Sequence, residues 1–330
     1  MKSQNMWIAQ EAAIEATTQL ELIKPSWEQE IDIFSIIEHA GIPLMFRRMK
    51  RLFGAYIPAE DKIASKEGIL INSNHPRSLQ RYTAAHEFAH HIQDKSLSLD
   101  EEMEVLERTQ QIILNPKERF AEHFASWFLM PPQLIKNLTK KLDIAVKRPE
   151  PNAIYQLSLA LGTSYKATIT QLLTLQEITF QQAEALRRWQ PKEIKGQLSW
   201  DDNLLNPRND VWFITGNYRS QHIHPRVGDE LCVALREIPS TGYVWVRADS
   251  GAKIELLGQR FIEPESGAGF GAEGQHKFYF ILTEPGPYNL SLTMQRPWIG
   301  IQSQMEEFDL DLLIEEERLG INLDLLLSEA

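Results

Sequence analysis

Two histidines and a glutamate in residues 86–90 have the types and spacing that could bind a metal ion. The segment reads His-Glu-x-x-His, with His86 and His90 four positions apart and Glu87 directly after the first histidine. On a helix, residues four apart share a face, so both imidazoles can bind one zinc ion. Glu87 can then act as general base on a zinc-bound water. The alternative interpretation of so short a pattern is an amphipathic helix with two surface histidines.

A catalytic zinc needs a third protein ligand and one open position. Asn115 followed by Pro116 is typical of a helix N-terminus, and that helix would place Glu118 and Glu122 one turn apart on the same face. Glu118 is the predicted third ligand. Glu122 is predicted to accept a hydrogen bond from the free ring nitrogen of a ligating histidine. The alternative is that both glutamates face solvent, but beside the histidine motif the site interpretation is favoured.

Two segments together resemble the ImmA/IrrE family of zinc metallopeptidases. Residues 81–90 match its His-Glu-x-x-His helix, and residues 118–131 match its later Glu-x-x-Ala-Asn/Asp-x-Phe-Ala helix, which ends in Leu-Met-Pro. The resemblance implies a minimal thermolysin-like zincin core with a zinc cofactor and a protein substrate, such as a transcriptional repressor. It implies the following roles: His86, His90 and Glu118 as zinc ligands and Glu87 as the base.

The chain departs from this family at position 122, where glutamate stands in place of the usual Asn or Asp. A longer carboxylate could compete for the metal, so the choice between Glu118 and Glu122 is open.

Residues 68–72 form a short apolar run that predicts a strand. We propose this strand as the edge that holds an extended substrate, and a plain core strand is the alternative. Pro25 and Ser26 predict a helix that begins at Ser26.

Residues 154–189 read as short helices joined by tight turns, in a pattern that resembles a helix-turn-helix unit. DNA binding is not supported, because Lys166 is the only basic residue between Gly162 and Glu184.

Residues 206–302 differ in composition: short alternating apolar runs are separated by turn residues, which predicts a β-sandwich.

Three loops of this second region could form a binding surface. The first two lack bulk, so their backbone can approach another surface closely, while the third offers the Trp and Arg that dominate binding hot spots. The loop residues are Pro239, Ser240, Thr241 and Gly242; Gly269 and Gly271 within the glycine-rich stretch 267–274; and Arg296, Pro297 and Trp298. Ordinary hairpin chemistry is the alternative for any one loop.

Taken in order, the three loops resemble the chagasin family of cysteine-protease inhibitors. The matching segments are residues 228–231, 241–245 and 296–298. The resemblance implies an immunoglobulin-like sandwich that wedges its loops into the cleft of a papain-like cysteine protease. Ile238 stands where an Asn is usual, and Phe270 interrupts the glycine loop, and either departure could weaken inhibition or redirect the site to another partner.

Bulk composition limits the remaining functions. The net charge is −11, which argues against a broad nucleic-acid surface, and residues 303–330 carry −8 of it, from nine acids and one arginine. Cys232 is the single cysteine, which excludes an intrachain disulfide and a cysteine-based zinc site. No run of 18 apolar residues occurs, so no membrane span and a cytoplasmic location are expected.

The 330 residues therefore predict a multidomain α+β protein. Its expected parts are a metallopeptidase domain at 1–139, a helical helix-turn-helix-like module and linker at 140–205, a chagasin-like sandwich at 206–302, and an acidic amphipathic tail at 303–330. The first functional hypothesis is a zinc endopeptidase. The second is an inhibitor of papain-like proteases with a regulatory or vestigial zinc site, and the third has the sandwich delivering a partner to the peptidase.

Overall fold

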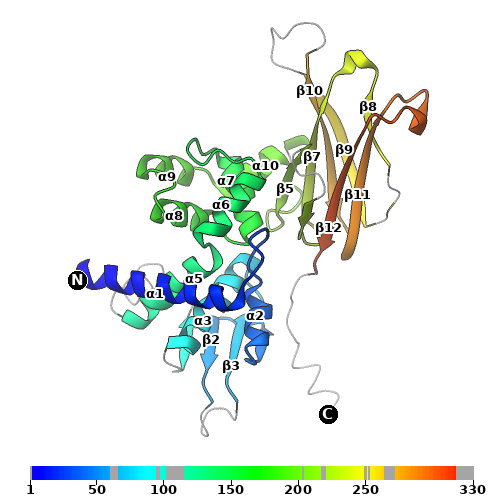
Figure 1. Ribbon diagram of the computed structural model, residues 1–330. Coiled ribbons are helices and arrows are strands. Elements are labelled where there is room, and N and C mark those ends of the chain that lie inside the picture. Colours follow the sequence, from blue (N-terminus) through cyan, green and yellow to red (C-terminus); the bar gives the residue numbers. More distant parts are fainter. Residues whose placement is uncertain are drawn as a thin grey trace, which may run out of the picture.

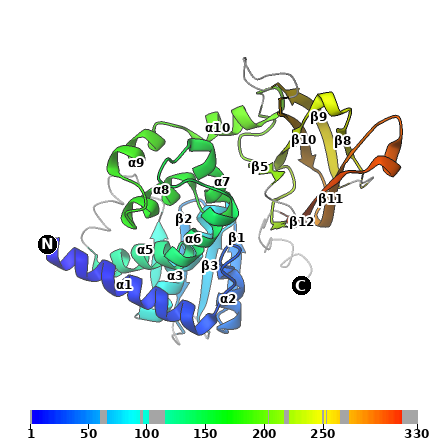
Figure 2. The same cartoon turned by 45° about the horizontal axis from the view of Figure 1, so that its top comes forward.

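The computed structural model describes residues 2–59, 66–93, 97–101, 115–202, 204–216, 221–248, 251, 253–263 and 272–316. Figure 1 shows a helix-rich N-terminal half beside a sandwich of strands, and Figure 2 shows the same two bodies from above. The expected multidomain α+β architecture is confirmed. Within the described residues, no helix combines the length and the apolar character needed to cross a membrane.

A four-stranded sheet with the order β1-β3-β2-β4 supports the N-terminal half. β1 (Leu44–Arg47) runs parallel to β3 (Gly68–Asn72), while β2 (Leu52–Ile57) is antiparallel to both β3 and β4 (Ser98–Glu101). The strand predicted at 68–72 is present, but its predicted role as the substrate-binding edge is wrong. β3 is hydrogen-bonded to β1 on one side and β2 on the other, so it has no free edge to offer.

Helices cover this sheet and carry the predicted motif. α3 (Arg77–Gln93) packs against β2 and β3, and α5 (Pro116–Leu129) lies between α3 and α1 (Lys2–Ile23). The side chain of Asn115 accepts a hydrogen bond from the Lys117 N–H at 3.0 Å, which confirms the predicted cap of α5. The helix predicted to begin at Ser26 instead begins seven residues later, because Asp32 caps α2 (Ile33–His39).

Five further helices follow without a break in packing. They are α6 (Pro132–Lys141), α7 (Pro151–Leu161), α8 (Tyr165–Thr174), α9 (Phe180–Arg187) and α10 (Pro191–Leu198), and the short turn η1 (Trp200–Asp202) ends the series. Their apolar side chains belong to the same buried core as those of the sheet and of α3 and α5. The predicted boundary at residue 139 therefore separates two parts of one packed unit.

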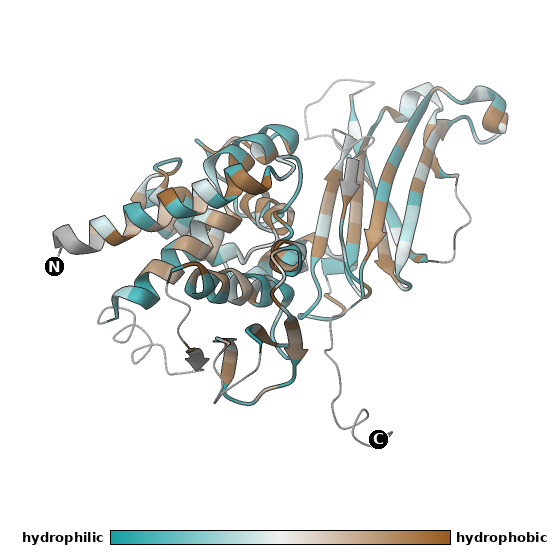
Figure 3. Ribbon diagram, turned by 60° about the horizontal axis from the view of Figure 1, so that its bottom comes forward, coloured by the Kyte–Doolittle hydropathy of each residue, from teal (hydrophilic) through white to brown (hydrophobic). Residues whose placement is uncertain are grey.

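The C-terminal half is a sandwich of two four-stranded sheets. One sheet has the order β5-β7-β10-β9 and the other β6-β12-β11-β8, and a separate apolar core lies between them. The strands are β5 (Val211–Thr215), β6 (Gln221–Ile223), β7 (Glu230–Glu237), β8 (Val244–Arg247), β9 (Ile254–Ile262), β10 (Gly274–Leu282), β11 (Gly286–Gln295) and β12 (Glu306–Ile314). Apolar and polar residues alternate along several strands, as Figure 3 shows.

The last strand corrects the predicted acidic tail. Residues 306–314 form β12, which pairs with β11 over nine positions and with β6 on its other side. Phe308, Leu310 and Leu312 point into the core, while the acids between them occupy the other face. The amphipathic pattern over residues 306–314 is therefore the two-residue period of a strand packed on the core of the chain itself. Residues 317–330 of the predicted tail lie outside the described residues.

Candidate metal centre and protein-binding loops

Three side chains from two helices converge at the centre of the N-terminal half. The Nε2 atoms of His86 and His90 are 3.3 Å apart, and Glu118 oxygens lie 3.2 Å from the first and 3.6 Å from the second. Ligand atoms at about 2.1 Å from one ion in a tetrahedron are about 3.4 Å apart. The donor set, two imidazoles and one carboxylate, is one that zinc binds in catalytic sites. The residues present therefore fit a metal ion.

The histidines of this group are buried, so the alternative of two surface histidines is wrong. His86 and His90 expose 1% and 2% of their surface, and Glu87, between them on α3, exposes none. Burying three ionisable side chains on one helix costs folding free energy that an ordinary core helix would avoid. Such a concentration marks functional sites more often than structural ones.

Glu118 carries a negative charge in this group. Burial by itself would raise the pKa of Glu118, but hydrogen bonds and charges from His86 and His90 outweigh it and hold the pKa well below its usual range. The side chain is 22% exposed, so it borders solvent while its oxygens face the histidines. An ionised carboxylate beside two imidazoles is the state that can ligate a cation.

Glu122 lies one turn farther along α5, where its carboxylate accepts a hydrogen bond from the Tyr82 hydroxyl. Tyr82 also lies beside the histidines, with its ring centre 6.5 Å from that of His86. The predicted hydrogen bond from a ligating histidine to Glu122 stays a prediction. Sequence reasoning missed Tyr82, although its position four residues before His86 places it on the same face of α3.

The first and third of the predicted protein-binding loops come from one end of the sandwich. Pro239, Ser240 and Thr241 form the turn η3, which Gly242 closes in a left-handed conformation at φ +75°. A Cβ at Gly242 would lie 2.8 Å from the Trp298 ring, so glycine lets the first and third loops touch.

The third loop presents its large side chains to solvent. Trp298 is 70% exposed, and the Arg296 guanidinium lies over the Tyr243 ring at 4.6 Å from its centre. Pro297 stands between them, ahead of the turn η4 (Gly300–Ser303). The predicted contributors Gly269 and Gly271 lie outside the described residues.

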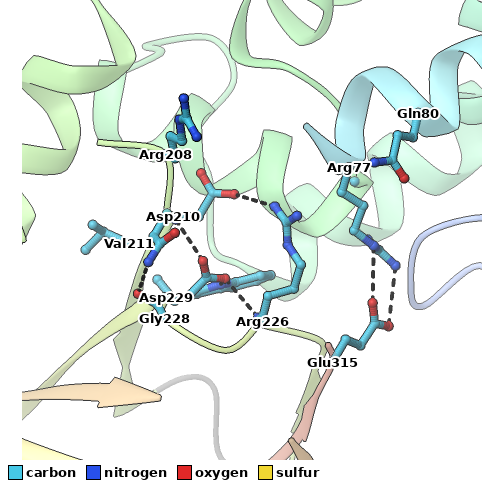
Figure 4. Close-up of polar contacts among 12 residues, drawn as sticks. Arg77, Gln80, Arg208, Asp210, Val211, Arg226, Gly228, Asp229 and Glu315 are labelled. Atoms are coloured by element: carbon cyan, nitrogen blue, oxygen red, sulfur yellow. Dashed lines mark hydrogen bonds and ion pairs between the residues drawn. The ribbon is translucent and has the colours of Figure 1, made fainter. Parts of the chain in front are cut away.

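The opposite end of the sandwich contacts the helical half. An ion pair joins Glu315 to Arg77, the first residue of α3, at 3.2 Å (Figure 4), and Asp210 pairs with Lys195 of α10 at 3.0 Å. A cavity of about 970 Å³ lies between the halves, lined by these groups and by Arg226. Residues 239–242 and 296–298, which we call the tip, follow the C-terminal ends of β7 and β11. Both ribbon views place the loop after β11, which contains η4, away from the helices (Figures 1 and 2).

Comparison with known families agrees with this division. Residues 37–170 match the model of the IrrE N-terminal-like domain, a peptidase family, and residues 225–312 match the chagasin family of peptidase inhibitors. The chain therefore carries an IrrE-like domain and a chagasin-like domain. The IrrE-like domain contains the buried His-His-Glu group, and the chagasin-like domain contains the first and third loops in full.

Three solved structures are similar to the chain. The cysteine protease inhibitor EhICP2 from Entamoeba histolytica is 20% identical over 33% of this chain and 100% of its own, with a TM-score of 0.31. The Leishmania mexicana ICP is 23% identical over 32% and 90%, with a TM-score of 0.23. PbICP-C, solved in complex with falcipain-2, is 17% identical over 32% and 91%, with a TM-score of 0.21. None of the curated proteins matches the chain.

Proposed function

We propose that the IrrE-like domain is a zinc-dependent endopeptidase that hydrolyses a peptide bond in a protein substrate. The supporting observation is the convergence of His86, His90 and Glu118 with a fully buried Glu87 on the same helix. His86, His90 and Glu118 would hold the zinc. When bound, zinc would polarise the substrate carbonyl and make water more acidic.

Glu87 supplies the proton transfers of this reaction. Its carboxylate takes a proton from the attacking water as the new C–O bond forms, and it returns that proton to the amine nitrogen as the C–N bond breaks. The site is buried, so the carboxylate meets few competing solvent molecules, and proton transfer is directed to the reacting atoms. The substrate class suggested by the family resemblance is a protein such as a transcriptional repressor.

The test uses a library of peptides with blocked N-termini, so that each cleavage creates one new amine that mass spectrometry can count. Zinc-loaded wild-type protein is expected to create new amines, and Glu87→Gln is expected to reduce their rate about 100-fold or more at unchanged zinc content. Full cleavage by Glu87→Gln would show that Glu87 is not the base. No cleavage by the wild type across libraries from several proteomes would overturn the peptidase proposal.

A second function is favoured by the exposed tip of the chagasin-like domain. We propose that it binds a papain-like cysteine protease through residues 239–242 and 296–298, with Trp298 as the anchor. Trp298→Ala is expected to weaken inhibition of papain about 30-fold, as expected for an aromatic hot spot. Leu313→Ala is the control and should inhibit like the wild type, because Leu313 is half-exposed and lies where β12 pairs with the start of β11, at the end of that strand remote from the third loop. Absence of papain inhibition by the wild-type chain would refute this function.

A further inference from the structure

α5 offers two carboxylates to the metal centre rather than one. Glu118 and Glu122 lie one turn apart, and both contact residues of α3. A catalytic zinc site keeps one coordination position open for substrate or water, so a second carboxylate ligand would fill the position that the reaction needs. The chain therefore requires a feature that assigns the two glutamates different roles.

The pairing of α3 with α5 supplies that feature. The helices run antiparallel: His86 of α3 faces Glu118, and Tyr82, one turn earlier, faces Glu122, one turn later. Each glutamate thus contacts the α3 residue directly opposite it, and the two contacts lie one helical turn apart. A shift of one helical turn would instead bring Glu122 opposite His86.

Tyr82 donates its hydroxyl hydrogen to the Glu122 carboxylate. A phenol carries one O–H group, and an ionised carboxylate can only accept hydrogen bonds. A hydrogen bond to a charged acceptor is roughly twice as strong as one between neutral groups. The Tyr82 hydroxyl also lies 3.4 Å from the Glu122 carbonyl oxygen, so it sits directly over this turn of α5.

We propose that Tyr82 is a positioning residue that keeps the Glu122 carboxylate out of the metal-ligand set, and so leaves one coordination position open. This inference rests on the proposed zinc function, and it selects Glu118 over Glu122 as the third ligand. It also gives a physical role to the glutamate at position 122, because the longer side chain can reach Tyr82 while remaining on the face that points to α3.

The experiment titrates the protein, freed of metal, with Co²⁺ and records visible absorption, which reports coordination number without any need for catalysis. Tyr82→Phe keeps the ring and removes only the donor. It should release Glu122 to the metal, weaken the absorption as the coordination number rises, and tighten Co²⁺ binding severalfold. The double variant Tyr82→Phe/Glu122→Gln should recover the wild-type spectrum, because the competing carboxylate is gone.

Two single variants provide the controls. Glu122→Gln alone should retain the wild-type Co²⁺ affinity, whereas Glu118→Gln should lose about tenfold or more, because only Glu118 is a ligand. An unchanged spectrum in Tyr82→Phe, or an equal loss of affinity in Glu122→Gln and Glu118→Gln, would overturn the role of Tyr82 and leave the zinc proposal standing. A wild-type chain that binds no Co²⁺ would overturn the zinc proposal itself.

Discussion

At the scale of single residues, Gly54 determines how closely the motif helix approaches the sheet. A Cβ built on Gly54 of β2 would lie 2.3 Å from the Thr83 methyl and 2.8 Å from the Leu70 carbonyl oxygen. The same position is 3.6 Å from Cγ of Glu87, so any movement of α3 away from β2 also moves the proposed base. The close approach of α3 to β2, and with it the position of Glu87, therefore requires that residue 54 has no Cβ.

We predict that Gly54→Ala destabilises the protein by about 1–3 kcal/mol, the cost of overpacking a close-packed core, and lowers peptide cleavage. Urea denaturation measures the first effect and the peptide library the second. Gly196→Ala is the matched control: a Cβ at this position would lie 3.9 Å from the Asp202 carbonyl oxygen, and Gly196 lies in α10, where alanine favours helix. Equal stability of the two variants would contradict the crowding at Gly54.

The spacing of His86, Glu87 and His90 predicted their shared site because a helix converts sequence spacing directly into geometry. Glu118 could be proposed from its helix but not selected over Glu122, since that choice depends on the register between α3, which ends at Gln93, and α5, which begins at Pro116. Tyr82 and Gly54 were missed for the same reason. Their roles come from contacts across α5 and β2, which local patterns do not encode.

At the scale of elements, one carboxylate ties α3 to the segments around it. Glu30, in the loop before α2, pairs with Arg77 at 2.5 Å and with the fully buried Arg81 at 3.3 Å. Arg81 also donates hydrogen bonds to the carbonyl oxygens of Ile31 and Gly162, the latter at the end of α7. Glu30 thus neutralises two arginines that hold three parts of the N-terminal half together.

The pKa of Glu30 makes this tie dependent on pH. Burial would raise the pKa of Glu30, but the charges of Arg81 and Arg77 outweigh burial and lower it from 4.5 to about 2. Because the folded pKa is below the unfolded one, the stabilisation is complete above about pH 4.5 and is lost as the pH falls toward 2. Its size is on the order of 3 kcal/mol.

We predict that Glu30→Gln lowers the free energy of unfolding at pH 7 and flattens its decline between pH 4.5 and 2. Urea denaturation across this pH range measures both effects. Glu28→Gln, an exposed neighbour in the same loop, should follow the wild-type curve. A Glu30→Gln curve parallel to the wild type would show that another group carries this part of the acid sensitivity.

Several elements followed from the sequence because they depend on local signals. Asn115 and Pro116 fixed the start of α5, and the apolar run at 68–72 fixed β3. The edge role of β3 failed because strand order is set by distant pairing with β1 and β2. The helix start at Ser26 failed because the Asp32 side chain, six residues later, caps the helix that forms.

At the scale of the whole molecule, a side chain completes the edge of the sandwich. β5 is an edge strand, and Gln156 of α7 donates to the Val211 carbonyl at 3.0 Å while accepting from the Phe213 N–H at 2.9 Å. These are hydrogen bonds that a neighbouring strand would otherwise make. The helical half thus holds the chagasin-like domain by its edge, and the loop that follows β11 lies away from the helices (Figures 1 and 2).

This arrangement could not be read from the sequence, which predicted the two halves but gave no signal for their contact. Both partners look ordinary in isolation: Gln156 is a polar residue within a helix, and residues 211–215 are a short apolar strand. The structure brings them together and leaves Gln156 only 6% exposed. One consequence is that loss of Gln156 should weaken the contact between the domains, which Glu315–Arg77 and Asp210–Lys195 also make, without unfolding either domain.

We predict that Gln156→Ala increases the rate of trypsin cleavage at the exposed Arg208, in the connection between the halves, about tenfold. The substitution leaves the buried Val211 carbonyl and the part-buried Phe213 N–H without Gln156 as their partner, which costs about 1–3 kcal/mol of free energy of association between the domains. Gln171→Ala is the control, because buried Gln171 donates to the Met130 carbonyl at 3.2 Å inside the helical half. It should lower overall stability and leave cleavage at Arg208 close to the wild-type rate. Equal acceleration in both variants would mean that Gln156 supports the helical half rather than the contact between the domains.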